Sequence, residues 1–163
     1  MNRLLVDSRF RPDPGLHFGR PELKSLTALW HEKRGSRIAP DRTDFDPLTL
    51  RDYLSRIIIY EVVGAPPQHR FRFRLYGTLV AEFSGRDVTG RMLDEVMPPE
   101  ACADYRRILD KLITEPYPLR VTGTLYYLDR SFVHFECVSL PLTVGGGDRI
   151  GQIMDILYYP DEG

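Results

Sequence analysis

The sequence has few of the features that mark secreted or membrane-spanning proteins. It contains only two cysteines, Cys102 and Cys137, and their spacing matches no CxxC pattern. We expect them to be free thiols in a reducing compartment. The apolar run at residues 4–6 is too short for a signal peptide, and no stretch approaches the roughly 20 apolar residues of a membrane span. These absences favour a cytoplasmic protein without membrane insertion.

An excess of charge of one sign is also missing. The chain has 22 basic and 23 acidic residues, so its formal net charge is −1. Proteins that bind nucleic acid by neutralising phosphates usually carry a strong basic excess. We therefore expect no nucleic-acid partner. The length of 163 residues, with 42% hydrophobic and 28% charged residues, is typical of one ordinary globular domain.

Motifs of catalysis and metal binding are absent as well. The chain has no HExxH, GxSxG or P-loop sequence, and the glycines at 145–147 lack the lysine and helix of a phosphate cradle. None of the histidines stands at a recognised zinc-ligand spacing. They are His17, His31, His69 and His134. We expect no metal site and no enzymatic activity.

The first helix is predicted at residues 21–34, after a proline- and glycine-rich segment. Residues 1–20 show little periodicity and are expected to form a flexible arm, which leaves 21–163 as the domain. A proline suits the first helical turn, and Gly35 suits the position after the last. The apolar stripe of this helix comprises Leu23, Leu26, Leu29 and Trp30. A shorter helix is predicted near 47–55, because Asp46 can cap its start.

Two strands joined by a short turn are predicted at 57–63 and 70–75. The first is rich in β-branched residues, and the second alternates between apolar and basic residues. Its apolar members, which we expect to be buried together with Phe83, are Phe71, Phe73 and Leu75. Its basic members are Arg70, Arg72 and Arg74. They form either a stripe that docks an anionic partner or a solvated face with salt bridges, which we favour.

Helices and then three further strands complete the pattern. Short helical segments are predicted near 79–84 and from Leu93, and a longer helix at 99–114. Strands at 119–125, 132–142 and 150–159 are joined by short turns, so they must be antiparallel. The order predicts an α+β fold, with a five-stranded antiparallel sheet, helices on one face and an N-terminal amphipathic helix.

Four segments, in this order, resemble a family of short single-domain PAS proteins found mainly in alphaproteobacteria. They are Leu29 to Gly35, Asp44-Phe45-Asp46-Pro47, Phe71 to Thr78 and Phe83 to Gly90. The resemblance covers about residues 22–158, and the PAS fold has the same order of elements. It implies a sensory or protein-interaction role and no particular ligand.

Cofactors known from PAS proteins are not expected here. Photoreactive flavin domains resemble an Asn-Cys-Arg-Phe helix, whereas Cys102 lies in Glu-Ala-Cys-Ala-Asp. Haem-binding PAS domains usually supply a histidine from the helical region between the second and third strands, and residues 77–116 contain none. The resemblance therefore implies neither flavin nor haem.

A small apolar cavity between the sheet and the helices is the expected ligand site, because PAS-like folds bind ligands there. Its predicted wall comprises Leu79, Phe83, Met92, Tyr105 and Leu109. His134 is the polar group that would reach this space if its face of the strand points inward. The alternative, which we favour, places His134 on the outer side of the sheet.

The sequence thus predicts a bacterial sensory or regulatory module for signal transduction that binds a small ligand or a protein partner and signals by non-covalent association. The alternative is a small cone-like α+β enzyme of the isomerase or hydratase type that uses an Asp–His pair, for which Asp155 and His134 are the pair to examine. The helix at 21–34 buries its stripe either on its own sheet or on a second subunit. Resemblance to PAS proteins that pair through such helices favours a homodimer with Leu23, Leu26, Leu29 and Trp30 at the interface.

Overall fold

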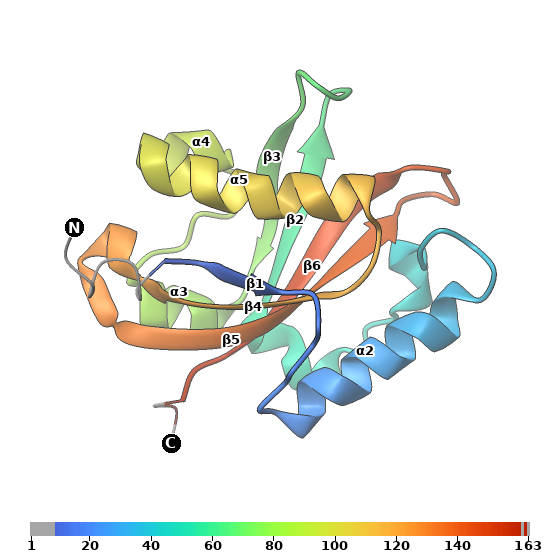
Figure 1. Cartoon of the computed structure of the whole chain (residues 1–163), viewed down its shortest axis with the longest axis horizontal. Coiled ribbons are helices and arrows are strands. Elements are labelled where there is room, and N and C mark those ends of the chain that lie inside the picture. The colour runs from blue at the N-terminus through green and yellow to red at the C-terminus, as the bar shows by residue number, and fades with distance from the viewer. Residues whose placement is uncertain (1–8, 161, 163) are drawn as a thin grey trace.

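A single antiparallel sheet organises residues 9–160 and 162, which are the residues that the computed structural model describes (Figure 1). Six strands in this part of the chain are arranged in the order β1-β4-β5-β6-β2-β3. Their bounds are β1 Arg11–Asp13, β2 Ile57–Val63, β3 Arg70–Tyr76, β4 Leu119–Leu125, β5 Arg130–Thr143 and β6 Ile150–Tyr158. The α-helices are α2 Pro21–Arg34, α3 Thr78–Ser84, α4 Leu93–Val96 and α5 Pro99–Thr114. Three 3₁₀ helices connect them: η1 Arg42–Asp44, η2 Arg51–Arg56 and η3 Tyr126–Leu128.

The α+β fold predicted from the sequence is confirmed, and one strand is added to it. Helices α2 and α5 have the predicted bounds, whereas the helix predicted at 47–55 is the 3₁₀ helix η2. The additional strand, β1, lies in the segment expected to be a flexible arm, where Arg11 pairs with Thr122 and Asp13 with Arg120. An edge strand tolerates the proline between them. Residues 1–8 of the expected arm lie outside the described residues.

Helices cover the sheet on both faces (Figure 1). Helices α3, α4 and α5 lie over what we call the inner face, and α2 crosses the opposite, outer face. The central strands are therefore buried on both sides: the first four residues of β2 and the last seven of β5 are all buried. Such continuous burial explains why these strands read as unbroken apolar runs rather than as alternating patterns.

The apolar stripe of α2 packs against the sheet of its own chain. Leu23, Leu26 and Trp30 are 0–2% exposed, and Leu29 is half-buried. The indole Nε1 of Trp30 donates a 2.8 Å hydrogen bond to the carbonyl oxygen of Pro141 in β5. The interface expected from these four residues is therefore already occupied within one chain. The homodimer stays a prediction, and it would need a different surface.

Asp41 ties the linker after α2 to the loop between β5 and β6. Its carboxylate accepts hydrogen bonds from the backbone N–H of Gly146 at 2.8 Å, from the Thr143 hydroxyl at 3.0 Å and from the Thr43 hydroxyl at 2.8 Å. These donors, the Gly146 N–H first, lower the pKa of Asp41 to about 2. The linker is thus held against the sheet by a buried carboxylate rather than left as a tether.

The motifs that carry the family resemblance have local structural roles. Asp44 accepts a hydrogen bond from the backbone of Asp41, Phe45 is buried, and Asp46 accepts one from the backbone N–H of Thr49 at the next turn. Gly77 lies against η2 so closely that a Cβ atom there would be 2.3 Å from the carbonyl oxygen of Ser55. Glycine is required at this position because the two backbones touch.

The alternation in β3 has the predicted direction. Phe71 and Phe73 are buried in the core, while Leu75 and Phe83 pack at its margin and are partly buried. Phe83 stacks on Tyr159 with the ring centroids 4.0 Å apart. The predicted burial is therefore confirmed for Phe71 and Phe73, whereas Leu75 and Phe83 lie closer to the surface.

Truncation of the tryptophan tests whether α2 is part of this domain. We expect Trp30→Ala to lower the free energy of unfolding by about 3–5 kcal/mol, since it removes a fully buried indole. Urea denaturation followed by far-UV circular dichroism measures this loss. Leu29→Ala, on the same helix but half-buried, is the matched control and should cost clearly less. Equal losses for the two variants would contradict packing of the stripe on the sheet.

Candidate functional site

The space between the inner face and the helices is almost completely filled by side chains. A cavity of about 30 Å³ remains there, which is roughly the volume of one water molecule. Aromatic side chains from several strands and helices occupy the rest. Residues of the cavity wall that carry a hydroxyl group are Tyr60, Tyr76, Ser84, Tyr105, Tyr127 and Tyr159. The cavity is therefore small but polar at its edges.

Of the residues expected to form the ligand site, Tyr105 lines this cavity. Leu109 is fully buried, and Leu79 and Phe83 lie at the margin of the core. The backbone of Met92 pairs with the backbone of Arg72 in an isolated antiparallel β-bridge at the edge of β3. Much of the wall comes instead from strand residues such as Ile58, Tyr60 and Leu157, whose inward direction depends on register. A small cavity therefore lies between sheet and helices, and of the predicted lining only Tyr105 belongs to its described wall, while its use as a ligand site stays a prediction.

His134 lies on the outer face, as the favoured alternative had it. It is exposed and stands opposite Thr124 in the β4–β5 register, whereas its neighbours Phe135 and Val133 are buried. Asp155 lies on the inner face, where it contacts Tyr105 of α5. The Asp155–His134 pair of the enzyme alternative is therefore not formed, because the sheet separates the two side chains.

A buried carboxyl group is the most unusual feature of the inner face. Asp155 is 0% exposed, and its Oδ2 accepts a hydrogen bond from the Tyr105 hydroxyl. Within the described residues neither its Oδ1 nor the hydroxyl of Ser139 makes a hydrogen bond of normal geometry. Ser139 lies directly opposite in the β5–β6 register, and its hydroxyl is near enough to lower the pKa of the Asp155 carboxyl. Unpaired polar atoms at this depth are costly, so two of them side by side call for a physical explanation.

Burial changes the acidity of this polar centre, by which we mean Asp155, Tyr105 and Ser139. Desolvation raises the pKa of Asp155 to about 6, with the neighbouring hydroxyls limiting the rise. Burial also raises the pKa of Tyr105 and of Cys137 well above their usual values. Tyr105 therefore stays a hydrogen-bond donor and Cys137 stays a thiol at neutral pH. The centre can accept or donate hydrogen bonds, but it offers no thiolate nucleophile.

A different Asp–His pair exists at the edge of the helical layer. The Nε2 atom of His69 lies 2.6 Å from Oδ1 of Asp110, and the imidazole is buried while the carboxylate is 41% exposed. Arg106 also donates to the carbonyl oxygen of His69. Together these contacts fasten the start of β3 to α5. Neither partner lines the interior cavity, and their separation of 41 residues left no local signal in the sequence.

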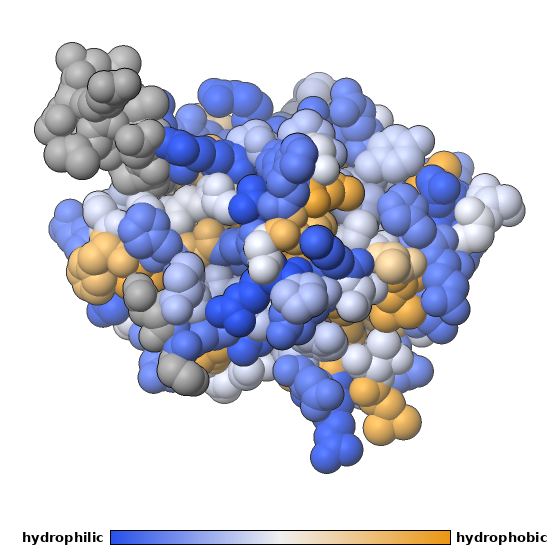
Figure 2. All heavy atoms as spheres, turned by 60° about the horizontal axis from the view of Figure 1, so that its bottom comes forward, coloured by the Kyte–Doolittle hydropathy of each residue, from blue (hydrophilic) through white to orange (hydrophobic). Residues whose placement is uncertain are grey.

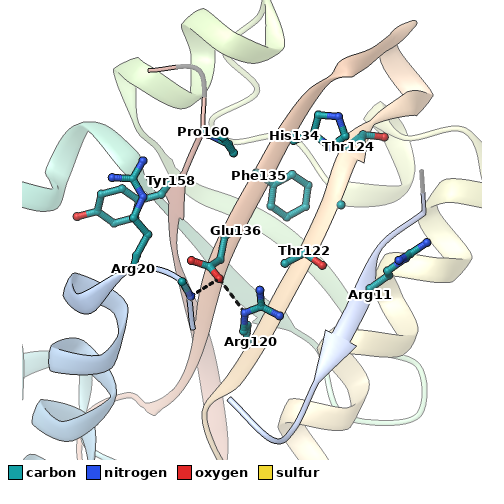
Figure 3. Close-up of a pocket in the computed structure, with 12 residues that line it drawn as sticks. Arg11, Arg20, Arg120, Thr122, Thr124, His134, Phe135, Glu136, Tyr158 and Pro160 are labelled. Carbon is teal, nitrogen blue, oxygen red and sulfur yellow. Dashed lines mark hydrogen bonds and ion pairs between the residues drawn. The ribbon is translucent and has the colours of Figure 1, made fainter. Parts of the chain in front are cut away.

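The outer face carries a wider groove of about 600 Å³ (Figure 3). Arg120 donates to Glu136 at 2.8 Å, and Glu136 also accepts from the backbone N–H of Gly19 at 2.9 Å. Arg120 further contacts Asp13, and Arg20 lies 3.7 Å from Glu162. Because carboxylates balance these guanidinium groups, the groove has no simple anion-binding character.

The face of the molecule shown in Figure 2 is mostly hydrophilic, with apolar residues in separate patches. Carboxylates also lie beside two guanidinium groups in the arginine row of β3. Arg70 makes two hydrogen bonds to Asp94, at 2.6 and 2.8 Å, and Arg72 lies 3.5 Å from Glu61. Exposed ion pairs of this kind contribute little stability. The favoured description of the row as a solvated face with salt bridges therefore fits the structure at these two positions.

Other groups that bear on function are found as follows. Both cysteines are free thiols. Among the described residues, no three side chains of the metal-binding types lie close enough to hold an ion, and no helix is long and apolar enough to cross a membrane.

A family model described as PAS domain matches residues 19–154. No curated protein matches the chain. The matched range includes the four α-helices and the strands β2 to β5, lacks β1, and ends within β6 directly before Asp155.

The buried carboxyl predicts a specific dependence of stability on pH. Because the folded-state pKa of Asp155 is raised, the folded chain binds this proton more tightly than the unfolded chain does. Its stabilising contribution is therefore present below pH 4 and is lost as the pH rises through 6. Relative to Asp155→Asn, the wild type should lose about 3 kcal/mol over this interval, at 1.36 kcal/mol per pKa unit.

Urea denaturation of both proteins from pH 4 to pH 7.5 measures this difference. Asp148→Asn, which changes an exposed loop carboxylate, is the matched control and should follow the wild type. Parallel curves for the wild type and Asp155→Asn would show that the carboxyl is not desolvated in solution.

Proposed function

The chain belongs to the PAS domain family, and on that premise we propose that it is a sensory or regulatory module that binds a small ligand at its inner face and acts by association rather than by catalysis. The observation that carries the proposal is the polar centre around Asp155, which is fully buried and adjoins the interior cavity through Tyr105, a residue of the cavity wall.

The energetic argument starts from the unpaired oxygen. Leaving a buried acceptor without a partner costs about 1–3 kcal/mol, and replacing buried polar groups by apolar ones of similar shape is often neutral or stabilising. An apolar side chain at position 155 would therefore make the fold at least as stable as the carboxyl group does. A ligand that hydrogen-bonds to Oδ1 of Asp155 or to the hydroxyl of Ser139 would satisfy atoms that the folded chain leaves unpaired.

The composition of the wall indicates the class of ligand. Several aromatic rings surround the cavity, and their hydroxyl groups stay protonated because burial raises the pKa of Tyr105, of Tyr60 and of Tyr127. Such a site favours a small, flat and uncharged molecule with one or two polar substituents. An anionic ligand would meet no compensating arginine or lysine, since the part of the cavity wall that the structure describes contains none.

The proposal requires the interior cavity to enlarge when a ligand binds. A cavity of about 30 Å³ cannot hold a metabolite, so binding requires that side chains of the wall move. A ligand that binds only an open conformation shifts the population toward it. The signal would then reach the outer face through β6 and β5, because β5 carries the carbonyl group of Pro141 to which Trp30 of α2 is bonded.

A protein-binding adaptor is the second candidate, and the nearly filled interior favours it. In that case the fold serves as a rigid surface, and the polar centre fixes the register of β5 and β6. A homodimer is compatible with either function. Sedimentation equilibrium of the wild type decides it, since a monomer at high micromolar concentration would exclude the dimer.

Native mass spectrometry of the purified chain tests the ligand-binding proposal. We expect a co-purified small molecule on the wild type that denaturing conditions release. Asp155→Leu should lose this molecule while it keeps or gains stability, because it exchanges the carboxyl group for an apolar side chain of similar size.

Asp148→Leu, at an exposed loop position, is the matched control and should keep the ligand. A wild type without any adduct, combined with no thermal shift from a panel of small aromatic metabolites, would favour the adaptor instead.

A further inference from the structure

The N-terminal segment places a partly buried aromatic side chain against the core. Phe10 lines the interior cavity, and its ring lies 4.8 Å from that of Tyr105 in an edge-to-face arrangement. The rings of Tyr126 and Phe135 lie within 6.1 Å of it. Phe10 precedes residue 19, where the match to the PAS domain family begins. A residue from outside the matched part of the chain thus fills part of the space where the family fold has its ligand site.

Strand β4 is shaped to receive this segment. A Cβ atom at Gly123 would lie 3.2 Å from Cδ1 of Phe10 and 3.3 Å from the carbonyl oxygen of Arg9. Glycine in the interior of a strand weakens it and often marks a close approach of another backbone. No positive φ angle requires a glycine at position 123. The close approach of residues 9 and 10 is therefore the physical reason for a glycine there.

Besides the ring of Phe10, the segment is held by the backbone pairing of β1 with β4 and by an ion pair of Asp13 with Arg120 at 3.2 Å. Arg9 forms an ion pair with Glu100 at 2.6 Å, but both side chains are more than half exposed, and such pairs contribute little. Strand β1 has three residues and lies at the edge of the sheet. Elements with few buried contacts open locally at low cost. Release of Phe10 would therefore leave the rest of the fold intact.

We infer that residues 9–13 form a reversible plug, in which Phe10 occupies the ligand cavity and a small aromatic ligand with a polar substituent competes with it. This inference rests on the proposed ligand-binding function and adds the element that controls access. Withdrawal of the ring joins its volume to the present cavity, and cavities on the order of 150 Å³ are large enough to bind benzene. The polar substituent then reaches the hydroxyl groups around Tyr105.

Two variants of the full chain separate a plug from an ordinary core residue, with phenol as the probe. Phe10→Ala shortens the plug and enlarges the cavity. Gly123→Ala adds volume instead, and its methyl group would lie 3.2–3.3 Å from atoms of residues 9 and 10, so that these residues must shift by a few tenths of an ångström. We expect both variants to bind phenol at least tenfold more tightly than the wild type in isothermal titration calorimetry. Phe132→Ala, which removes an exposed phenylalanine of β5, is the control and should match the wild type.

Hydrogen exchange supplies the second measurement. The backbone amides of Arg11 and Asp13 should exchange faster in Gly123→Ala than in the wild type, and saturation of the wild type with phenol should accelerate them too. Circular dichroism confirms that each variant is folded. Amides that stay protected in the wild type at saturating phenol would show that the ring binds without displacing the segment, and would overturn the plug.

The remaining outcomes distinguish the plug from the proposed function. Equal phenol affinity of the wild type and both variants would overturn the plug and leave ligand binding standing. Tighter binding by Phe10→Ala alone would mean that the substitution merely created a cavity, and would also overturn it. No binding by any of the three, with β1 released in Gly123→Ala, would overturn both the plug and the interior ligand site.

Discussion

Burial of the sheet on both faces is the constraint on which the rest of this structure depends. A sheet covered on one side leaves its other face to water, but here α5 and its neighbours occupy the inner face while α2 occupies the outer one. The central strands must therefore be apolar throughout, and any polar group among them needs a partner inside the protein. The hydrogen bond from Trp30 to Pro141 and the bonds to Asp41 meet that requirement on the outer side.

The inner side meets the same requirement only in part. Tyr105 satisfies one oxygen of Asp155, and the other oxygen remains unpaired beside the unpaired hydroxyl of Ser139. Asp155 and Ser139 belong to adjacent strands whose register is set by many backbone hydrogen bonds, so neither can move away without breaking the sheet. The polar centre is thus imposed on a rigid frame. That combination of rigidity and unmet hydrogen-bonding capacity is what a binding site needs, and a purely structural core avoids it.

The two aromatic neighbours of the centre differ in how firmly they are held. Tyr105 belongs to the long helix α5. This helix is also bound by His69, which directly precedes β3 and contacts Asp110 of α5. Phe10 is carried by a three-residue edge strand. The interior therefore has one wall that is fixed by secondary structure and one that is attached by a short segment. A domain built in this way can change the volume of its cavity without rearranging its sheet or its long helix.

Local patterns in the sequence determined most of the secondary structure. The apolar stripe of residues 21–34 and the alternation at 70–75 predicted α2 and β3 because neighbouring residues set helical and strand periodicity. Short turns determined the antiparallel connection of β4, β5 and β6. The strand β1 was missed, since three residues around a proline show no alternation. Only the tertiary structure decided the rest. Tyr105 and Asp155 are 50 residues apart, and the crossing of α5 over β6 brings them together. The register of β5 placed His134 outside and Phe135 inside, and Gly123 received Phe10 because β1 pairs with β4. Such contacts depend on packing between elements, and the periodicity of residues along the chain carries no information about that packing.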